Sequence, residues 1–372
     1  MKILFVNEYA ASRAVSGAEY SLMALAEGLR SAGQTVEIFT PAWKKNKLGQ
    51  GLTPLWFNNP FYYLYSAWQI YRKNFDLIHV HGKYILPGAV LAGWLTGKPV
   101  VITVRDFKFL CPLALCFTHQ QKQCRFNYFI SQEIPEYQKR YGGGNKLSLI
   151  LAKLWQYQLK WWLNRCRRVI GVSPQLAQIY RDNGVKRVEA IYNLPPLRQA
   201  QGYSPKDKHT VLSVGKLSYG KGTDTIIEAA KRLPQFKFVF AGELNPSLKT
   251  PFPKNCRYLG KVSHEAVLKL YEQASVFVIN SRWPEPLSRA GLEALSFGLP
   301  IVASDRGGNR ELIKDNGFLV DPNQPKAIAA AVVKAAKRQK GLSVRSQRLL
   351  QTRFDRQQII NLHLNLYNQL TK

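Results

Sequence analysis

Short apolar runs alternate with helical segments along this chain, and the alternation occurs twice. Lys2–Asn7 opens the first series and Thr210–Val214 opens the second, each as the kind of apolar run that forms a strand buried on both faces. The order strand, loop, helix, strand is that of a βαβ unit, which has parallel strands. The sequence therefore predicts an α/β protein with two Rossmann-like domains, whose parallel sheets face a central cleft.

The boundary between the two predicted domains is marked by composition. Residues 197–209 are polar and have no apolar period, which predicts a linker between an N-terminal domain at 1–196 and a C-terminal domain at 210–354. Helical segments are expected at about 324–340 and 342–370. The final part, about 355–370, lies beyond a complete second sheet, and we expect it to cross back and pack on the first domain.

The charge of the chain restricts its partners. The formal net charge is +30 over 372 residues, which favours nucleic acid, an anionic lipid surface or phosphorylated substrates. No helix-turn-helix, RRM or OB signature is present, so nucleic acid is not expected. Five cysteines, an odd number, favour reduced thiols and a cytoplasmic location. No signal peptide or membrane-spanning segment is predicted, and peripheral attachment to the inner face of the plasma membrane stays open.

The stretch from Ser281 to Glu311 holds two glutamates around a predicted helix. The helix is expected to start near Ser288, a good N-cap residue, and to stop at Phe297, before Gly298 and Pro300. Glu285 would lie just outside the helix N-terminus, where free N–H groups suit a diphosphate, and Glu293 would lie inside the helix. The alternative is a capped helix with two solvated glutamates.

Two lysines follow the first strand of the second domain. Lys216 and Lys221 are five residues apart, in a loop that Gly215, Gly220 and Gly222 allow to fold tightly. Two ammonium groups there can neutralise a diphosphate and stabilise the charge that builds as a bond breaks. The alternative is a pair of solvated lysines. The double glycine 307–308 follows the strand Ile301–Ser304 and also permits close backbone approach.

The first domain carries polar residues at the carboxyl ends of its predicted strands, where parallel sheets bind ligands. These are His79 and His81 after one strand and Arg105 and Asp106 after the next, with Gly17 at the first loop-to-helix turn. Buried histidines and a plain turn glycine are the alternatives. A further spacing, C-x4-C-x2-H-x4-C, could hold zinc or simply line a loop; its members are Cys111, Cys116, His119 and Cys124.

Basic and aromatic residues are mixed in segments 42–75 and 105–168. The predicted helix Leu147–Trp162 combines Trp155, Tyr157, Trp161 and Trp162 with Lys153 and Lys160. This mixture is typical of a helix at a membrane interface, and a helix packed on the sheet is the alternative. We read the two segments as favouring an anionic membrane surface or a lipid-linked glycan.

These motifs together resemble the two-domain GT-B glycosyltransferases, specifically the retaining family four, also called glycosyl transferases group 1. Residues 215–222 (GKLSYGKG) are similar to the family's donor-diphosphate loop, with Lys216 in the place of an arginine. The spacing from Glu285 to Glu293 resembles the family's E-x7-E motif, and residues 307–311 resemble its GG-x-x-E segment. In the first domain, the glycine loop at residues 16–19 and the D-x-x-H-x-H pattern at residues 76–81 also match.

The resemblance implies a role for each matching residue. Glu285 would contact the donor sugar, and Glu293 the nucleotide ribose. Backbone amides would face the sugar and phosphates, at Leu287, Ser288 and Arg289. The resemblance also implies that the sugar is transferred with retained configuration and that no divalent metal or other cofactor is needed.

One position departs from the family pattern. Many relatives carry T-x-H-D-x3-L-C-P, whereas residues 103–112 of this chain place Arg105 where the histidine would be. An arginine stays charged at neutral pH, so it could hold a leaving phosphate or an anionic acceptor but could not accept a proton.

The sequence therefore predicts a glycosyltransferase that moves a sugar from a nucleoside diphosphate sugar to a hydroxyl of a glycan or lipid-linked acceptor, in cell-surface polysaccharide or glycolipid synthesis. The alternative is a non-catalytic protein of the same fold that binds a sugar or a polyanion.

Overall fold

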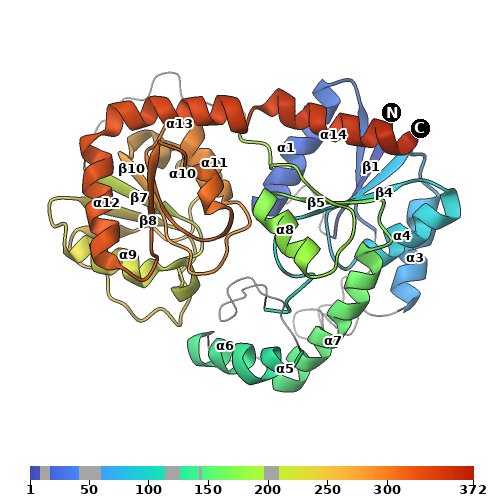
Figure 1. Ribbon diagram of the computed structural model, residues 1–372, viewed down its shortest axis with the longest axis horizontal. Helices are drawn as coiled ribbons and strands as arrows, with labels where there is room; N and C mark the ends of the chain where they lie inside the picture. The colour runs from blue at the N-terminus through green and yellow to red at the C-terminus, as the bar shows by residue number, and fades with distance from the viewer. Residues whose placement is uncertain (9–16, 42–59, 114–125, 142–144, 197–208) are drawn as a thin grey trace. The chain divides into compact units, whose positions relative to one another are not determined.

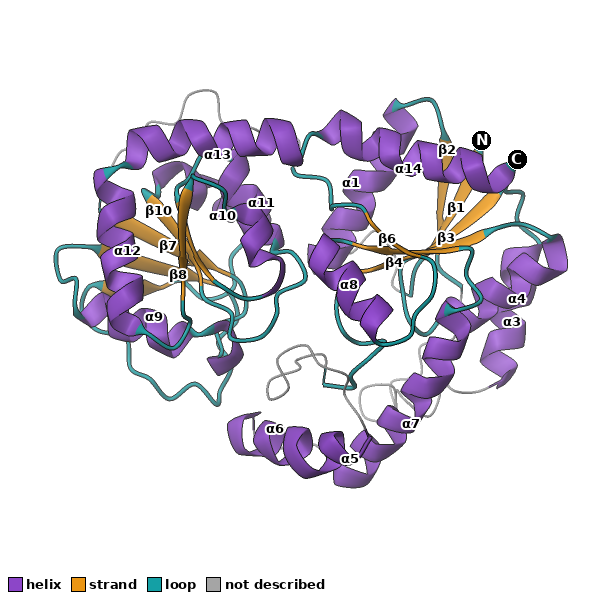
Figure 2. Cartoon of the chain, viewed as in Figure 1, coloured by secondary structure: helices purple, strands orange, loops and turns teal. Residues whose placement is uncertain are grey.

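The computed structural model describes residues 1–8, 17–41, 60–113, 126–141, 145–196 and 209–372. The chain divides into two compact units. Unit 1 comprises Met1–Pro135, Gly144–Leu194 and Arg356–Lys372, and unit 2 comprises Glu136–Gly143 and Pro195–Asp355. Each unit holds one six-stranded parallel sheet flanked by helices (Figure 1, Figure 2), which confirms the predicted α/β class. The predicted linker at 197–209 lies, except for His209, outside the described residues.

The sheet of unit 1 has the strand order β2-β1-β3-β4-β5-β6. Its strands are β1 (Lys2–Val6), β2 (Thr35–Phe39), β3 (Leu77–Val80), β4 (Val100–Val104), β5 (Arg168–Gly171) and β6 (Val188–Ala190). Its helices are α1 (Gly17–Ser31), α3 (Pro60–Tyr71), α4 (Leu86–Thr96), α5 (Phe126–Tyr128), the π-helix η2 (Phe129–Glu133), α7 (Lys146–Leu163), α8 (Pro174–Asp182) and α14 (Arg356–Thr371). Helix α6 (Ile134–Tyr141) starts in unit 1 and ends in unit 2.

The sheet of unit 2 has the order β12-β11-β10-β7-β8-β9. Its strands are β7 (Thr210–Val214), β8 (Lys237–Ala241), β9 (Cys256–Tyr258), β10 (Val276–Ile279), β11 (Ile301–Ser304) and β12 (Gly317–Val320). Its helices are η3 (Tyr219–Lys221), α9 (Thr223–Lys231), α10 (His264–Gln273), α11 (Arg289–Ser296), η4 (Gly307–Leu312), α12 (Pro325–Lys337) and α13 (Gln339–Arg353).

The central strands are buried along their whole length, as expected for parallel strands covered on both faces. All residues of β3, β4, β10 and β11 are buried. In unit 1 the helical residues predicted to face the sheet, Leu22, Leu25, Ala26 and Leu29, join one core cluster with the strands. Apolar periodicity therefore placed the core face of α1 correctly.

Two helices of the structure were not predicted, and one predicted helix is divided in two. No helix was predicted at 60–71 or at 86–96, where α3 and α4 form. The segment 342–370 is not one helix, because α13 ends at Arg353 and α14 begins at Arg356. Asp355 precedes α14, and aspartate is favoured at helix starts. Across the described residues, no helix is both long and apolar enough to cross a bilayer.

The final helix, α14, packs in unit 1, as predicted. Ile359 and Ile360 lie in the core cluster of α1, and Ile360 passes so close to Gly28 that a side chain there would collide with it. The fold therefore joins its first and last helices against one sheet.

A buried hydrogen-bond chain fixes α14 to the strands. The Tyr367 hydroxyl lies 2.7 Å from Nδ1 of His79 in β3, and Nε2 of the same ring lies 2.7 Å from the Thr103 hydroxyl in β4. Burial, with His363 and Arg105 adding to it, holds the pKa of His79 well below its usual range. The neutral ring has one donor and one acceptor nitrogen, and hydroxyls can satisfy both.

We expect Tyr367→Phe to destabilise the protein by about 1–3 kcal/mol, because it leaves a buried imidazole nitrogen without a partner. Urea unfolding would measure the difference. Tyr157→Phe, at a half-exposed position of α7, is the matched control and should unfold with the wild-type midpoint. Equal midpoints for Tyr367→Phe and the wild type would contradict the role given to this chain of hydrogen bonds.

Candidate active site

In the parallel sheet of unit 2, the order in which the chain adds strands reverses between β7 and β10. From β7 the strands continue through β8 to β9 on one side, and from β10 through β11 to β12 on the other. Open α/β sheets bind ligands beyond the carboxyl ends of the strands at such a switch point. The two segments that follow these strands, 215–222 and 280–288, are therefore the expected components of a site.

The loop after β7 has a shape that only glycine permits at Gly222. This residue has a φ of 62°, and a Cβ atom there would lie 2.2 Å from the carbonyl oxygen of Asn280. Ser218 stabilises the turn because its hydroxyl accepts from the Lys221 N–H at 3.3 Å. The loop is thereby held against the segment that follows β10.

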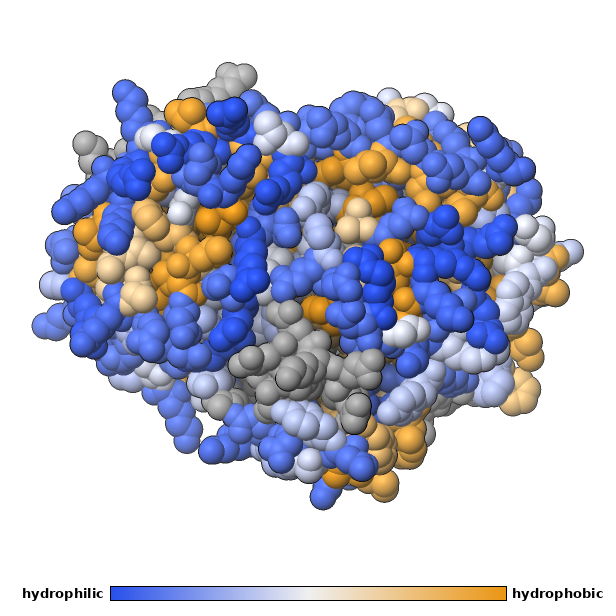
Figure 3. Space-filling view, viewed as in Figure 1, coloured by the Kyte–Doolittle hydropathy of each residue, from blue (hydrophilic) through white to orange (hydrophobic). Residues whose placement is uncertain are grey.

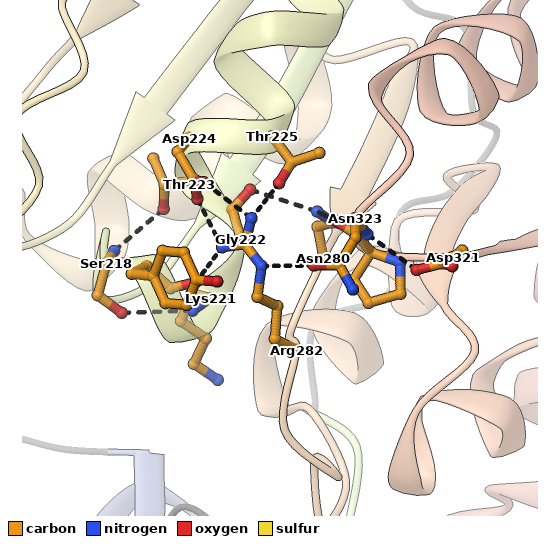
Figure 4. A network of polar contacts seen from close by, with 12 residues as sticks. Ser218, Lys221, Gly222, Thr223, Asp224, Thr225, Asn280, Arg282, Asp321 and Asn323 are labelled. Carbon is orange, nitrogen blue, oxygen red and sulfur yellow. Dashed lines mark hydrogen bonds and ion pairs between the residues drawn. The ribbon is translucent and has the colours of Figure 1, made fainter. Parts of the chain in front are cut away.

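An arginine clamp joins the two segments (Figure 4). Arg282 makes a two-pronged ion pair with Asp224, with N–O distances of 2.7 and 2.8 Å, and also donates to the Tyr219 carbonyl. Its Nε donates to Asn323 at 2.8 Å. Bidentate contacts of this kind fix geometry as well as charge.

Glu285 is the carboxylate that this arrangement places beside the loop. Its Oε2 accepts from Lys221 Nζ at 2.6 Å, from the Ser281 hydroxyl at 2.7 Å and from Trp283 Nε1 at 3.0 Å. Burial alone would raise the pKa of Glu285, but Lys221 and the two other donors hold the pKa below its usual value of 4.5. The group is therefore a carboxylate at neutral pH.

The double glycine 307–308 supports the backbone of this carboxylate. A Cβ atom on Gly307 would lie 2.3 Å from the backbone of Glu285, and one on Gly308 would lie 2.0 Å from the Pro286 carbonyl. The Gly308 N–H also donates to the Glu285 carbonyl at 2.5 Å. The close approach that these glycines permit is used by the chain itself, and the predicted contact with a donor stays a prediction.

Helix α11 begins and ends as predicted. Ser288 is its N-cap, and the Ser288 hydroxyl accepts from the Gly291 N–H at 3.1 Å. The preceding residue, Leu287, is buried. Phe297 is the C-cap, and Gly298 follows with a positive φ. The N-terminal turn of α11 thus begins at Arg289, four residues after Glu285.

Glu293, inside α11, is almost fully buried. Its Oε1 accepts from Arg289 Nε at 3.2 Å, and its Oε2 accepts from the Tyr271 hydroxyl at 3.2 Å. Lys216, by contrast, is exposed at the start of the loop after Gly215. The structure therefore brings Lys221, Glu285 and the start of α11 together, and it holds Glu293 one helical turn or more further along.

In unit 1 the strand order places the corresponding switch point between β1 and β3. Glu8, two residues after β1, accepts from the Tyr84 N–H beyond β3, and a Cβ atom on Gly82 would lie 2.6 Å from the Glu8 side chain. Burial raises the pKa of Glu8 to about 7, against the opposing effects of the Tyr84 N–H and of Lys83.

Arg105 and His81 form a half-buried pair in the same unit. Arg105 Nη1 lies 2.9 Å from His81 Nδ1, and because a guanidinium only donates, this nitrogen must accept. Burial lowers the pKa of His81 well below its usual range, with His79 and Arg105 adding to the effect. Asp106 accepts from the Lys108 N–H at 2.8 Å, and Gly17 is the exposed first residue of α1.

The predicted cysteine cluster is only partly described. Cys111 is buried, and Cys116, His119 and Cys124 lie outside the described residues. Within the described ranges, no group of three or more His, Cys, Asp or Glu side chains is placed to hold a metal ion.

Sequence reasoning missed four residues of these sites: Ser281, Arg282, Trp283 and Glu8. A signal for two of them was present, because side chains two and four residues before Glu285 point to the same side when the segment is extended. Arg282 and Glu8 had no such signal, since their partners are remote in sequence.

Comparisons with known proteins agree with this geometry. The model of the Glycosyltransferase Family 4 matches residues 15–194, and that of the Glycosyl transferases group 1 matches residues 197–348. The chain is 30% identical over 185 residues to spore coat protein SA of Bacillus subtilis, covering 44% of this chain and 49% of that protein. It is 26% identical over 212 residues to the amylovoran biosynthesis glycosyltransferase AmsK of Erwinia amylovora, covering 51% and 47%. The chain thus spans about half the length of these curated relatives.

Solved structures share the fold of the whole chain. The HepE protein of Anabaena, in complex with UDP and glucose, superposes with a TM-score of 0.70 at 21% identity over 99% of both chains. The sucrose-phosphate synthase of Thermosynechococcus elongatus superposes with a TM-score of 0.72 at 19% identity, over 99% of this chain and 98% of that one.

We expect Lys221→Met to destabilise the protein by about 1–3 kcal/mol at pH 7, because it leaves the Glu285 carboxylate buried without its cation. In the wild type the pKa of Glu285 lies below its unfolded value, so the pair contributes stability above about pH 4.5 that is lost as the pH falls through the folded pKa. In the variant, burial would raise that pKa, so the gap in stability should narrow from pH 7 to pH 4.

Chemical unfolding at several pH values would measure this gap. Lys231→Met is the matched control, since it breaks an exposed ion pair with Glu228 and should cost about 0.5 kcal/mol or less. A gap for Lys221→Met that stays constant with pH would contradict the pairing.

Proposed function

Because the chain belongs to the family four, group 1 glycosyltransferases, we propose that it transfers a sugar from a nucleoside diphosphate sugar to an acceptor hydroxyl, with retention of configuration and without a divalent metal. Unit 2 would bind the donor, and unit 1 would bind the acceptor. The observation that carries this proposal is the meeting of Lys221, Glu285 and the start of α11 at the switch point of unit 2.

The donor would be held by charge from two sources. Lys221 and Lys216 supply ammonium groups for the diphosphate, and the first N–H groups of α11 after Ser288 carry a partial positive charge. As the bond between sugar and phosphate breaks, negative charge grows on the diphosphate, and cations fixed in advance stabilise it. This use of lysines and a helix end supports a reaction that needs no metal.

Glu285 would position the sugar. All three of its donors among the described residues reach Oε2, which leaves Oε1 to accept from a sugar hydroxyl. The three bonds also prevent the carboxylate from rotating, and the glycine pair fixes its backbone. Glu293 would bind the ribose of the nucleotide. To accept from a ribose hydroxyl, its carboxylate would give up the hydrogen bond from Tyr271 or the one from Arg289.

On the side of the acceptor, Arg105 would attract an anionic group. Its guanidinium cannot accept a proton, and the neutral His81 ring orients it. This supports a glycan or lipid-linked acceptor that carries phosphate or carboxylate, as does the net charge of +30. A lipid-linked acceptor would place the protein at the inner face of the plasma membrane, as a peripheral cytoplasmic protein.

The context proposed is synthesis of a cell-surface polysaccharide or glycolipid. AmsK is a glycosyltransferase of amylovoran biosynthesis, and the HepE structure holds UDP and glucose. UDP-glucose is therefore the first donor to test, within a panel of nucleoside diphosphate sugars.

We expect Glu285→Gln to slow release of nucleoside diphosphate from the donor by about 100-fold or more, including slow hydrolysis without acceptor, because the sugar loses its fixed anchor. Glu228→Gln, an exposed substitution in the same unit, should keep the wild-type rate. Equal turnover by Glu285→Gln and the wild type would remove Glu285 from the mechanism. Binding of UDP by calorimetry, with no turnover across the panel, would favour the non-catalytic alternative.

We also expect donor turnover to be the same in EDTA as in excess Mg²⁺, because Lys221 and Lys216 would supply the positive charge that a metal ion would otherwise supply. Lys221→Met should slow turnover in both buffers. Loss of activity in EDTA, restored by Mg²⁺, would contradict a metal-independent reaction.

A further inference from the structure

Three neighbouring helices of unit 1, α3, α4 and α7, carry most of the large apolar side chains exposed on the described part of the chain. Of sixteen such residues, five lie on α3, two on α4 and five on α7, and four lie elsewhere. We refer to the exposed residues of 61–71, 94–95 and 147–161 as the outer apolar face. Part of it is visible at the lower right of Figure 3, over α3 and α7.

The three helices that carry the outer apolar face pack directly on one another, and the exposed rings of Trp94 in α4 and Trp161 in α7 have centroids 6.3 Å apart. A Cβ atom on Gly88 of α4 would lie 2.0 Å from the Ser66 hydroxyl oxygen of α3, so these two helices are in close contact. Trp162 of α7 lies 6.3 Å from the ring of Tyr63 in α3 and 5.8 Å from that of Trp94 in α4.

Helix α3 is apolar on both sides. Phe61, Leu64, Trp68 and Tyr71 follow one another at helical spacing along its exposed side, while its other side buries residues such as Tyr63. A surface helix of a water-exposed protein normally has polar residues on its outer side. The exposed side of α3 therefore has the composition of a surface that something covers.

Helix α7 buries two polar side chains among its inner apolar residues and exposes leucines on its outer side. Lys153 is 3% exposed and donates from Nζ to the Leu110 carbonyl at 3.2 Å, and Gln156, also buried, donates to the Lys108 carbonyl at 3.0 Å. In the same helix Leu147 is 64% exposed and Leu154 is 50% exposed. Lysines are rarely buried, so a helix with lysine inward and leucines outward is arranged for an apolar medium on its outer side.

The charged residues within and directly flanking the three helices that carry the outer apolar face are basic. The helices α3, α4 and α7 contain no aspartate or glutamate, and exposed basic residues follow or open them at Arg72, Lys98, Lys146 and Arg165. The Arg72 guanidinium lies 4.9 Å from the ring centre of Trp68, and that of Arg165 lies 3.2 Å from the ring centre of Trp161. Cations are thus held at the rim of an aromatic and aliphatic surface.

We propose that the outer apolar face docks unit 1 on the surface of an anionic lipid bilayer. The leucines and aromatic rings would enter the boundary between headgroups and acyl chains, and the four basic residues would contact anionic headgroups. Tryptophan and tyrosine favour this depth because one part of each ring is polar. A lipid surface explains why the three helices contain no acidic residue and have arginines beside them, whereas docking of a protein partner requires neither feature. The proposal goes beyond sugar transfer and does not depend on it.

Flotation with lipid vesicles tests this directly. Wild-type protein should float with vesicles of phosphatidylcholine containing phosphatidylglycerol, and at least about tenfold less with phosphatidylcholine alone. The double variant Leu151→Glu, Leu154→Glu should lose binding to the anionic vesicles by at least about tenfold, because it places two like charges in the inserted surface. Val344→Glu, in α13 of unit 2, is the matched control at an exposed apolar position and should float as the wild type does.

A second variant separates the contribution of charge from that of apolar contact. Arg72→Ala combined with Arg165→Ala should weaken binding to the anionic vesicles and make it less sensitive to salt, while binding to neutral vesicles stays the same. Thermal unfolding and donor turnover of all variants should match the wild type, since the substituted side chains are exposed. Flotation requires no turnover, so failure of the docking proposal and failure of the proposed reaction are distinguishable.

Several outcomes would overturn the docking proposal. These are equal flotation with anionic and neutral vesicles, wild-type flotation of Leu151→Glu, Leu154→Glu, or no flotation of the wild type at low salt. Dissociation of a wild-type dimer by the same double variant in sedimentation velocity, with no vesicle binding, would assign the face to a second copy of the chain instead.

Discussion

The ion pair between Lys221 and Glu285 is the interaction on which the candidate active site depends. Its two residues are 64 positions apart, and they meet because β7 pairs with β10 at the point where the strand order of the sheet reverses. Two neighbouring features hold the pair in place. Arg282 joins the two loops, and the glycines at 307 and 308 allow a third loop to pack against the backbone of Glu285. Without the pair, burial would raise the pKa of Glu285 against only the two hydrogen bonds from Ser281 and Trp283.

The separate parts of this site were predictable from the sequence, whereas their assembly was not. Ser288, Gly298 and Pro300 are local signals that act within a few residues, and they located α11 to within one residue. The pairing of β7 with β10 depends on which crossover the chain takes, and no local pattern encodes it. The arginine clamp likewise depends on a contact between Arg282 and Asp224, 58 residues apart.

The failures in unit 1 have a common physical cause. Helix prediction relies on a polar side that alternates with an apolar side, and α3 has no polar side, so the segment lacks a period. Helix α4 has the same character, with Trp94 and Leu95 exposed at its end. Helix α7 was predicted, at Leu147–Trp162, but its Lys153 is buried against the usual rule. The lack of a polar side prevented the prediction of α3 and α4 from the sequence. The same lack makes their outer surface suited to lipid.

The two units also differ in how their buried polar groups respond to pH. In unit 2 the buried carboxylate is paired with a lysine and stays ionised at neutral pH. In unit 1 Glu8 has a pKa of about 7, and the neutral His81 holds an arginine that is always charged. The charges of Lys221 and Glu285 in unit 2 therefore stay constant near neutral pH, whereas Glu8, at the switch point of unit 1, has a pKa in that range. A change in pH near 7 would then act on the loop after β3 in unit 1, because Glu8 holds the backbone at Tyr84 more strongly as a carboxylate than as a neutral acid.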